Sequence, residues 1–461
     1  MDGLTDTVTH GPADRPADGL TDVTLANGLR VLLQPLPGTQ VVASCLHVGT
    51  GFRNEPVAGA AHLLEHVLAQ GSSGTGPLTD AVAAMGGTMN ARTSADHTQY
   101  TQILPADGLE LGLRIERDRL AEPDLGADHI RAQIAVVQAE IRRNVLQRPH
   151  GGLVLFDLPA LLHDTWENRH NGYGDIDALG SLGPAELRTF FERSYAPGNI
   201  HLVLVGDFEP ARALELVERL LGTIPARETW QREPAAEAPL SAPRYTLRQE
   251  RIAPGGRTVL GFRVPDPAAA PADHLATVLL SELLEAVGAD CGCHPADARP
   301  WGAFRTRVDR TGNPFDVARA SLFAVEFPHP PGASPEAAET CLRAVLTRIA
   351  DGSLPVAEPL SVLRRQLALH LHAELDSVAG QASWLGVGAA VHGDPGHLAA
   401  LPAAIDAVTD ADVARLAGVY ASAPAARITS LPEAAPTAPS VPVTVTTAAS
   451  AKAPAASGAL A

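Results

Sequence analysis

The sequence predicts an α+β fold of two domains that look homologous, each a mainly antiparallel sheet with helices packed on one face. Three observations predict this fold. The chain has 461 residues, enough for two to four domains that each bury a core. Strand-like and helix-like segments follow one another in a similar order in both halves. A stretch without periodicity, rich in proline, alanine and glutamate, separates the halves at residues 228–243.

The first predicted domain covers residues 21–227 and follows a flexible polar arm, residues 1–20. Strands are expected where apolar residues alternate or β-branched residues gather, and helices where apolar residues recur every three or four positions. The expected strands are 23–34, paired with 41–49, then the exposed segment 88–105 and the segment 199–208. The expected helices are 59–72, 78–87, a pair of which the second spans 127–147, then 183–195 and 210–224.

The second predicted domain covers residues 244–432 and repeats that order without similar residues. Its expected strands are 244–252, 256–266, 303–310 and 315–327, and its expected helices are 274–287, 334–352 and 360–376. The remainder, residues 433–461, is an alanine- and proline-rich segment whose low complexity predicts a disordered tail.

The composition excludes several classes of protein. With 35 basic and 52 acidic residues the formal charge is −17, which disfavours binding to nucleic acid or to anionic lipid. We expect no secretory signal in the amino-terminal residues and no membrane span, because no apolar run approaches about 18 residues. Four cysteines are too few for a disulfide framework. These features predict a cytoplasmic bacterial protein.

The stretch GAAHLLEHVLAQGS (59–72) places His62, Glu65 and His66 inside an apolar helix. Positions i and i+4 share one helix face, so the two imidazoles could hold one Zn²⁺. Glu65 lies beside them, where a carboxylate could take a proton from a metal-bound water. This spacing is the H-x-x-E-H pattern of the inverzincins. The alternative is that a short pattern has arisen by chance among ordinary helix residues.

A catalytic zinc normally has three protein ligands, so a third must come from another element. Glu140 is the candidate, because it lies beside the apolar stripe of the 127–147 helix, next to Ile141 and one turn from Val137. An exposed helix acid near Arg142 would have the same spacing, and spacing alone does not choose between the two.

Several segments together resemble the pitrilysin/insulinase family of zinc peptidases. They are ANGLRVLL, AHLLEHVL, GGTMNARTSADHTQY, VVQAEI and YAPGNIHLVLVGDF. The resemblance implies that His62, His66 and Glu140 are zinc ligands and that Glu65 is the general base. It also implies a fold that forms half of a clamshell chamber. In this family the peptide substrate adds to the exposed edge of a sheet by β-augmentation. The matching positions here are Thr88, Met89, Asn90, Ala91, Arg92 and Thr93.

Members of the family also usually grip the peptide carbonyl with an arginine and a tyrosine seven residues apart. In the matching stretch ADARPWGAFRTRV, Phe304 stands in the tyrosine's place and Asp297 in the arginine's, while the nearest arginine is Arg299. Neither Phe304 nor Asp297 can act as such a donor. The departure predicts a partner subunit of the same fold that supplies the Arg/Tyr clamp, as a heterodimer in preference to a homodimer.

Other polar groups are less informative. Cys291, Cys293 and His294 resemble a metal cluster but are interpreted as a reduced loop. His370 and His372 face different ways on a helix and are interpreted as surface residues, and His97 could approach a substrate.

The sequence thus favours a zinc-dependent endopeptidase subunit that hydrolyses extended peptides. By analogy with the family, its role could be leader-peptide removal from a ribosomally made natural product. The alternatives are a homodimer that degrades oligopeptides in general and a non-catalytic scaffold subunit of the same fold.

Overall fold

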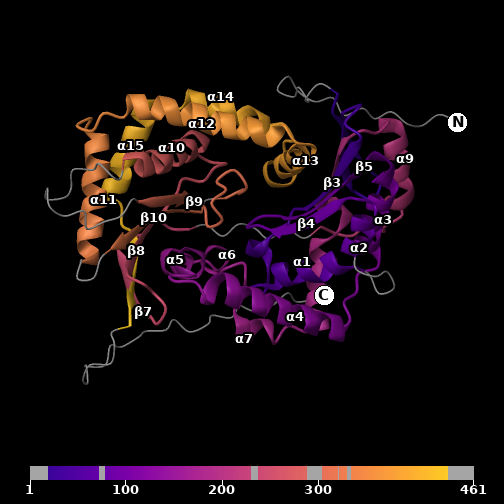
Figure 1. The fold of residues 1–461 in the computed structure, drawn as a ribbon, viewed down its shortest axis with the longest axis horizontal. Helices are drawn as coiled ribbons and strands as arrows, with labels where there is room; N and C mark the ends of the chain where they lie inside the picture. The colour runs from indigo at the N-terminus through magenta and orange to yellow at the C-terminus, as the bar shows by residue number, and fades with distance from the viewer. Residues whose placement is uncertain are drawn as a thin grey trace, which may run out of the picture.

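The computed structural model describes residues 19–71, 78–229, 237–287, 304–319, 321–329 and 334–433. They form two lobes side by side, each a sheet with helices packed against it (Figure 1). In the first lobe a six-stranded sheet has the order β1-β2-β6-β3-β5-β4, and in the second a five-stranded sheet has the order β7-β11-β8-β10-β9. The predicted fold class is confirmed.

The strands of the first lobe are β1 (Thr21–Thr24), β2 (Arg30–Pro35), β3 (Val41–Val48), β4 (Thr88–Thr93), β5 (Thr98–Pro105) and β6 (Ile200–Gly206). Its helices are α1 (Ala60–Gln70), α2 (Leu78–Ala84), α3 (Leu109–Ala121), α4 (Ala127–Ile141), α5 (Leu158–Leu162), α6 (Trp166–Arg169), α7 (Ile176–Leu179), α8 (Pro184–Ser194) and α9 (Pro210–Leu220).

The strands of the second lobe are β7 (Arg244–Glu250), β8 (Gly256–Arg263), β9 (Arg305–Val308), β10 (Leu322–His329) and β11 (Ala426–Pro432). Its helices are α10 (Pro271–Val287), α11 (Pro335–Ala350), α12 (Ala357–Leu375), α13 (Val378–Val387), α14 (Leu401–Ala407) and α15 (Asp410–Ser422).

The two sheets share one topology. Strands β2-β6-β3-β5-β4 of the first sheet correspond in order and direction to β7-β11-β8-β10-β9 of the second. In each set the first pair is parallel, β2 with β6 and β7 with β11, and the other pairs are antiparallel. By this correspondence β9 is the counterpart of β4, and both lie at the edge of their sheets.

Several details differ from the sequence prediction. The segment predicted as one strand, 23–34, is the antiparallel hairpin of β1 and β2, and the strand predicted over 315–327 begins only at Leu322, in β10. The first two predicted strands are not neighbours, because β6 lies between β2 and β3. The segment predicted as one strand, 88–105, is the antiparallel hairpin of β4 and β5. The helix predicted over 127–147 is α-helical only to Ile141 and widens into a π turn at Arg142–Leu146. These differences depend on strand pairing or local hydrogen bonding that apolar periodicity does not report.

Each lobe places a helix on the sheet of the other. Helix α13 of the second lobe packs on the first sheet, with Ala382 among Ala43, Cys45 and Val203. Helix α5 of the first lobe packs on the second sheet through buried residues, Leu158 and Leu162 against Val259, Ala324 and Ile428. Both sheets are therefore covered on both faces, and this exchange holds the lobes together through buried apolar area.

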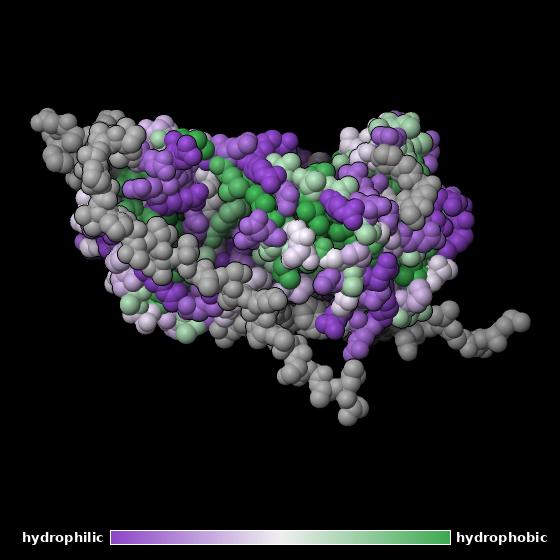
Figure 2. All heavy atoms as spheres, turned by 90° about the horizontal axis from the view of Figure 1, so that it is seen from below, coloured by the Kyte–Doolittle hydropathy of each residue, from purple (hydrophilic) through white to green (hydrophobic). Residues whose placement is uncertain are grey.

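The predicted arm and tail lie almost wholly outside the described residues. Within the described part, no helix is long and apolar enough to span a membrane. Hydrophilic and hydrophobic residues are intermixed on the face seen in Figure 2, and many of the hydrophobic ones gather toward its middle.

Candidate metal centre

His62 and His66 lie one turn apart on α1, beneath strand β4. Helix α1 is a core element, with Leu63, Leu64 and Val67 fully buried. That apolar face fixes the rotation of the helix, which turns both histidines toward α4. The imidazole rings stand nearly perpendicular, at an interplanar angle of 88°, with centroids 4.8 Å apart.

Glu140 reaches the two histidines from α4, which packs against α1. Its Oε2 atom lies 3.2 Å from Nε2 of His66 and 3.9 Å from Nε2 of His62. Two ligands of a tetrahedral zinc with bonds of ~2.0–2.1 Å lie about 3.3 Å apart, close to both separations. Within the described residues, this is the one group of three potential ligands whose donor atoms all lie within 4.8 Å of one another. The donor set of two imidazoles and one carboxylate therefore fits Zn²⁺.

The protonation of the three groups follows from their surroundings. Burial and the neighbouring His66 lower the pKa of His62 to about 4, so this imidazole is neutral at pH 7. Burial opposes protonation of His66 too, but its hydrogen bond to Glu140 and the charge of Glu65 raise its pKa. The same hydrogen bond lowers the pKa of Glu140. Both shifts favour a positively charged His66 beside a negatively charged Glu140, so binding of a metal ion at these atoms would be coupled to release of a proton.

Glu65 lies beside the histidines and is almost entirely buried, with 7% of its surface exposed. Its carboxylate Oε2 accepts a hydrogen bond of 2.9 Å from Oγ1 of Thr93, at the end of β4. Burial, assisted by the charge of Glu140, raises the pKa of Glu65. The carboxylate is therefore held in one orientation by Thr93, with a higher affinity for a proton than an exposed glutamate has.

All four groups open into a pocket of about 710 Å³ that β4 borders. The strand is the last in its sheet, so its outer edge pairs with no other strand of the described chain. Five of the six residues predicted to bind substrate, Met89 to Thr93, line this pocket, and Thr88 does not. The structure thus brings a free strand edge beside the candidate metal centre.

Tyr173 is a residue of this site that the sequence analysis missed. Its ring meets the His62 ring edge to face, with centroids 5.2 Å apart, and it lines the same pocket. Burial and the charges of Glu140 and Glu65 raise the pKa of Tyr173, so its hydroxyl remains a hydrogen-bond donor at neutral pH. Tyr173 lies in the irregular stretch RHNGYGD, which has no periodicity to indicate its orientation.

A buried carboxylate fixes the start of α1. Glu55 accepts hydrogen bonds from the backbone nitrogens of Gly59 (2.7 Å) and Ala61 (2.8 Å), and Nε2 of His170 lies 3.1 Å away. Gly59 has φ of 89°, and a Cβ there would lie 2.8 Å from the backbone of Gly174. Glycine is therefore required where the loop that carries Tyr173 crosses the start of the metal-site helix.

We expect Glu55→Ala to lower the free energy of unfolding by about 2–4 kcal/mol, because it leaves two buried backbone donors without their partner and removes the carboxylate beside His170. Urea denaturation followed by circular dichroism measures the loss. The matched control is Glu209→Ala, which removes an exposed carboxylate that caps α9 in the same way, at Ala211 and Arg212. A loss of about 1 kcal/mol is expected there. Equal losses in the two variants would contradict the role given to Glu55.

Other predicted residues lie elsewhere. Phe304 is 2% exposed and packs on Phe327 in the core of the second lobe, so it does not reach the metal site. His97 is fully buried beside Asp316, with 3.1 Å between Nδ1 and Oδ1, and so does not face a substrate. Five residues of the sequence analysis lie outside the described residues: Cys291, Cys293, His294, Asp297 and Arg299.

Two family models match the chain and together cover more than half of it. One, described as insulinase (peptidase family M16), matches residues 30–173, which include all four candidate residues. The other, described as the peptidase M16 inactive domain, matches residues 181–295. An uncharacterised zinc protease of Mycobacterium leprae is 29% identical over 266 residues, or 56% of this chain. The match spans 59% of the length of that relative.

Solved structures show the same fold. A protease from Helicobacter pylori superposes with a TM-score of 0.78 at 21% identity, over 90% of this chain and 99% of that chain. The first half of the periplasmic protease PqqL from Escherichia coli superposes with a TM-score of 0.70 at 19% identity, over 90% of this chain and 92% of that chain. In sequence, PqqL is 28% identical over 217 residues, which are 44% of this chain and 23% of PqqL.

The predicted cytoplasmic location is wrong by this comparison, because PqqL is a periplasmic protease. The prediction depended on the lack of a visible leader and on few cysteines, and neither feature reports a compartment. The family resemblance, by contrast, is confirmed by both family models. The chain belongs to the insulinase family of peptidases, family M16.

Proposed function

We propose that this chain is a zinc-dependent endopeptidase subunit that hydrolyses extended peptides. One observation carries the proposal: His62, His66 and Glu140 converge from two helices, with the buried carboxylate of Glu65 beside them and a free strand edge across the same pocket. Family membership supports it, and the mycobacterial relative is described as a zinc protease.

In this proposal, His62, His66 and Glu140 would hold a zinc ion, which would supply Lewis-acid activation by lowering the pKa of water at the site to about 7. Glu65 accepts the proton of the attacking water and passes it to the leaving amine. The hydrogen bond from Thr93 orients the Glu65 carboxylate for both transfers. Because Thr93 ends β4, the strand that would bind the peptide also positions the base.

The peptide is held as an added strand on β4. Main-chain groups of Thr88 to Thr93 supply hydrogen bonds that any extended sequence can make, and side-chain pockets supply selectivity. Folded proteins lack a free extended segment, so unfolded peptides and flexible termini are the expected substrates.

The experiment that tests this function uses the purified full chain and a quenched fluorescent decapeptide. We expect about one zinc per chain by elemental analysis, cleavage at internal bonds, loss of cleavage after chelation, and recovery when zinc is restored. Absence of zinc from a folded chain would instead favour the non-catalytic scaffold. Zinc without cleavage by the isolated chain would point to the missing partner.

We further propose a partner subunit of the same fold that closes the chamber, as a heterodimer in preference to a homodimer. The support is that Phe304 has no hydroxyl and is buried in the core of its own lobe. Leader-peptide removal from a ribosomally made product is the narrower role we propose. A neighbouring reading frame for a related chain without H-x-x-E-H, beside a short precursor gene, would support both proposals.

Substitution of Tyr173 tests whether the hydrogen-bond donors that bind the peptide carbonyl come from this chain or from a partner subunit. If its hydroxyl donates to the peptide carbonyl, we expect Tyr173→Phe to lower kcat/KM of the isolated chain by about 10²-fold, as loss of one such donor does elsewhere. If a partner supplies the donors, the isolated chain should be nearly inactive. Tyr173→Phe should then change the rate of the assembled enzyme less than about twofold. Peptide hydrolysis by each form, with zinc content as control, measures the difference.

A further inference from the structure

A second pocket, of about 500 Å³, lies between the lobes on the opposite side of β4 from the candidate metal centre. We call it the interlobe pocket. Helices α10, α12 and α13 of the second lobe line it together with β4 and β5 of the first. Asn90, Ala91 and Arg92 border both the interlobe pocket and the metal-site pocket. The two pockets therefore meet along the free edge of β4.

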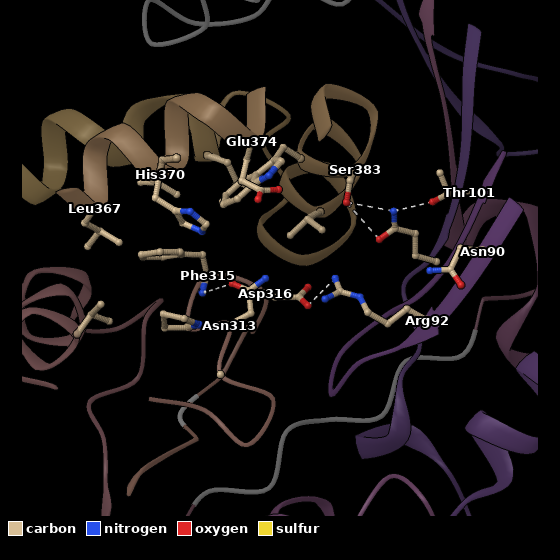
Figure 3. Close-up of a pocket in the computed structure, with 18 of the residues that line it drawn as sticks. Asn90, Arg92, Thr101, Asn313, Phe315, Asp316, Leu367, His370, Glu374 and Ser383 are labelled. Carbon is tan, nitrogen blue, oxygen red and sulfur yellow. Dashed lines mark hydrogen bonds and ion pairs between the residues drawn. The ribbon is translucent and has the colours of Figure 1, made fainter. Parts of the chain in front are cut away.

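The side chains of β4 alternate between these two pockets. Met89 and Ala91 pack against the core that contains α1, and Thr93 bonds to Glu65. Arg92 points the other way and pairs with Asp316 of the second lobe, at 2.8 Å (Figure 3). A peptide added to this edge has the same period of two. Consecutive residues of one bound peptide would thus face the metal site and the interlobe pocket in turn.

The interlobe pocket combines an apolar wall with acidic groups. Phe315, Leu367 and Trp384 supply apolar surface, and Figure 3 shows Leu367, His370 and Glu374 projecting from α12 over Phe315 and Asp316. Glu282 adds a second carboxylate from α10. Large apolar groups beside acids suit a side chain with a long aliphatic stem and a charged end.

The charge of the pocket is negative. Its one arginine among the described lining residues, Arg92, is already paired with Asp316, which is buried and also accepts a hydrogen bond from Ser94. Neither Glu282 nor Glu374 has an ion pair within the described part of the chain, and His370, exposed on α12, is the histidine that acts electrostatically on Glu282. Two carboxylates on separate helices therefore remain without a cationic partner.

We propose that the interlobe pocket is a substrate subsite that selects a long basic side chain, arginine or lysine, from a peptide bound along β4. The stem of that side chain packs on Phe315, Leu367 and Trp384, and its cationic end lies between Glu282 and Glu374. The selected residue is one whose neighbours in the peptide face the metal site. An acidic residue at this position is excluded by charge repulsion. This inference rests on the proposed function for the presence of a peptide on β4.

The test measures binding, so that it does not depend on cleavage. The probes are fluorescein-labelled decapeptides of serine, alanine and threonine with one arginine moved through each position, and the same peptides with norleucine in its place. Fluorescence anisotropy gives Kd for the zinc-loaded full chain with Glu65→Gln, which prevents turnover. We expect one or two alternate positions at which arginine binds about tenfold more tightly than norleucine, an advantage that falls as salt is raised.

Substitutions in the interlobe pocket then test whether its two glutamates cause the preference for arginine. Glu282→Gln with Glu374→Gln should reduce the advantage of arginine to less than about twofold while leaving Kd of the norleucine peptide unchanged. The matched control is Glu358→Gln, at the opposite end of α12 and outside the pocket, which should keep the full preference. Exposed glutamates on helix surfaces are chosen so that the variants fold.

Two outcomes would overturn the proposal: no position that prefers arginine, or a preference that survives in the double variant. Hydrolysis of the same peptides by the wild-type chain tests the proposed function separately. Cleavage without an arginine preference leaves the function standing and refutes the subsite. An arginine preference that depends on Glu282 and Glu374, without cleavage by the isolated chain, supports the subsite and assigns the missing cleavage to the absent partner subunit or to a loss of the hydrolytic function, which the assembled enzyme then tests.

Discussion

Glu65→Gln is expected to lower kcat/KM for peptide hydrolysis by at least about 10³-fold while zinc remains bound in full. The substitution preserves the shape of the side chain, and the hydroxyl of Thr93 can still donate to the amide oxygen. Glutamine cannot accept the proton of the attacking water, so the general base is lost, an effect of about 10²–10⁴-fold in enzymes. None of the three proposed ligands is altered, which is why the metal should stay.

The measurements are hydrolysis of a quenched fluorescent peptide and zinc content by elemental analysis. The matched control is Glu218→Gln, the same change on the exposed face of α9, which should leave both values unchanged. Activity of Glu65→Gln within tenfold of the wild type would refute the role of Glu65. If Glu65→Gln loses both its zinc and its activity, Glu65 instead contributes to holding the metal.

His66→Ala and Glu140→Ala are each expected to weaken zinc binding by at least about 100-fold and to abolish hydrolysis. Loss of a group that merely orients a ligand already costs about 10–100-fold in affinity, and these variants remove the ligand itself. Because Nε2 of His66 and Oε2 of Glu140 lie 3.2 Å apart, either variant also removes the contact between these two side chains. Competition with a fluorescent zinc chelator measures the affinity.

His372→Ala is the control for these variants, because His372 lies exposed on α12, far along the chain from the metal centre. It should bind zinc as the wild type does. Unchanged affinity in Glu140→Ala would contradict a three-ligand site, since two histidines alone on one helix would then account for the binding. That result would also favour the alternative interpretation of Glu140 as an ordinary helix acid without a role in metal binding.

The elements that the sequence predicted well are those whose apolar residues recur with a simple period along the chain. The stripe of Ile130, Val137 and Ile141 predicts α4, and all three residues are buried. Alternation through Val42 to Val48 predicts β3 to within a residue at its end. By contrast, β6 enters the sheet between β2 and β3 from more than 150 residues away, as its pairing of Arg30 with His201 shows. No local pattern reports such a pairing.

The residues of the candidate site likewise differ in whether a local sequence pattern could predict them. His62, Glu65 and His66 are grouped by helix spacing alone, so a local pattern could suggest them. Glu140 depended on a family resemblance, because only the packing of α1 on α4 brings it to His66. Tyr173 could not be found, since its loop has no period and is placed by a close approach of Gly174 to Gly59. The acids of the interlobe pocket become visible only when the lobes meet.

X-ray absorption at the zinc edge of the purified full chain tests whether His62, His66 and Glu140 hold the metal. We expect a first coordination sphere of two imidazole nitrogens and oxygen ligands at ~2.0–2.1 Å, with one imidazole signal lost in His62→Ala. Zinc–sulfur scattering at about 2.3 Å, which would place the metal on the cysteines near residue 291, would contradict it. So would a spectrum that His62→Ala leaves unchanged.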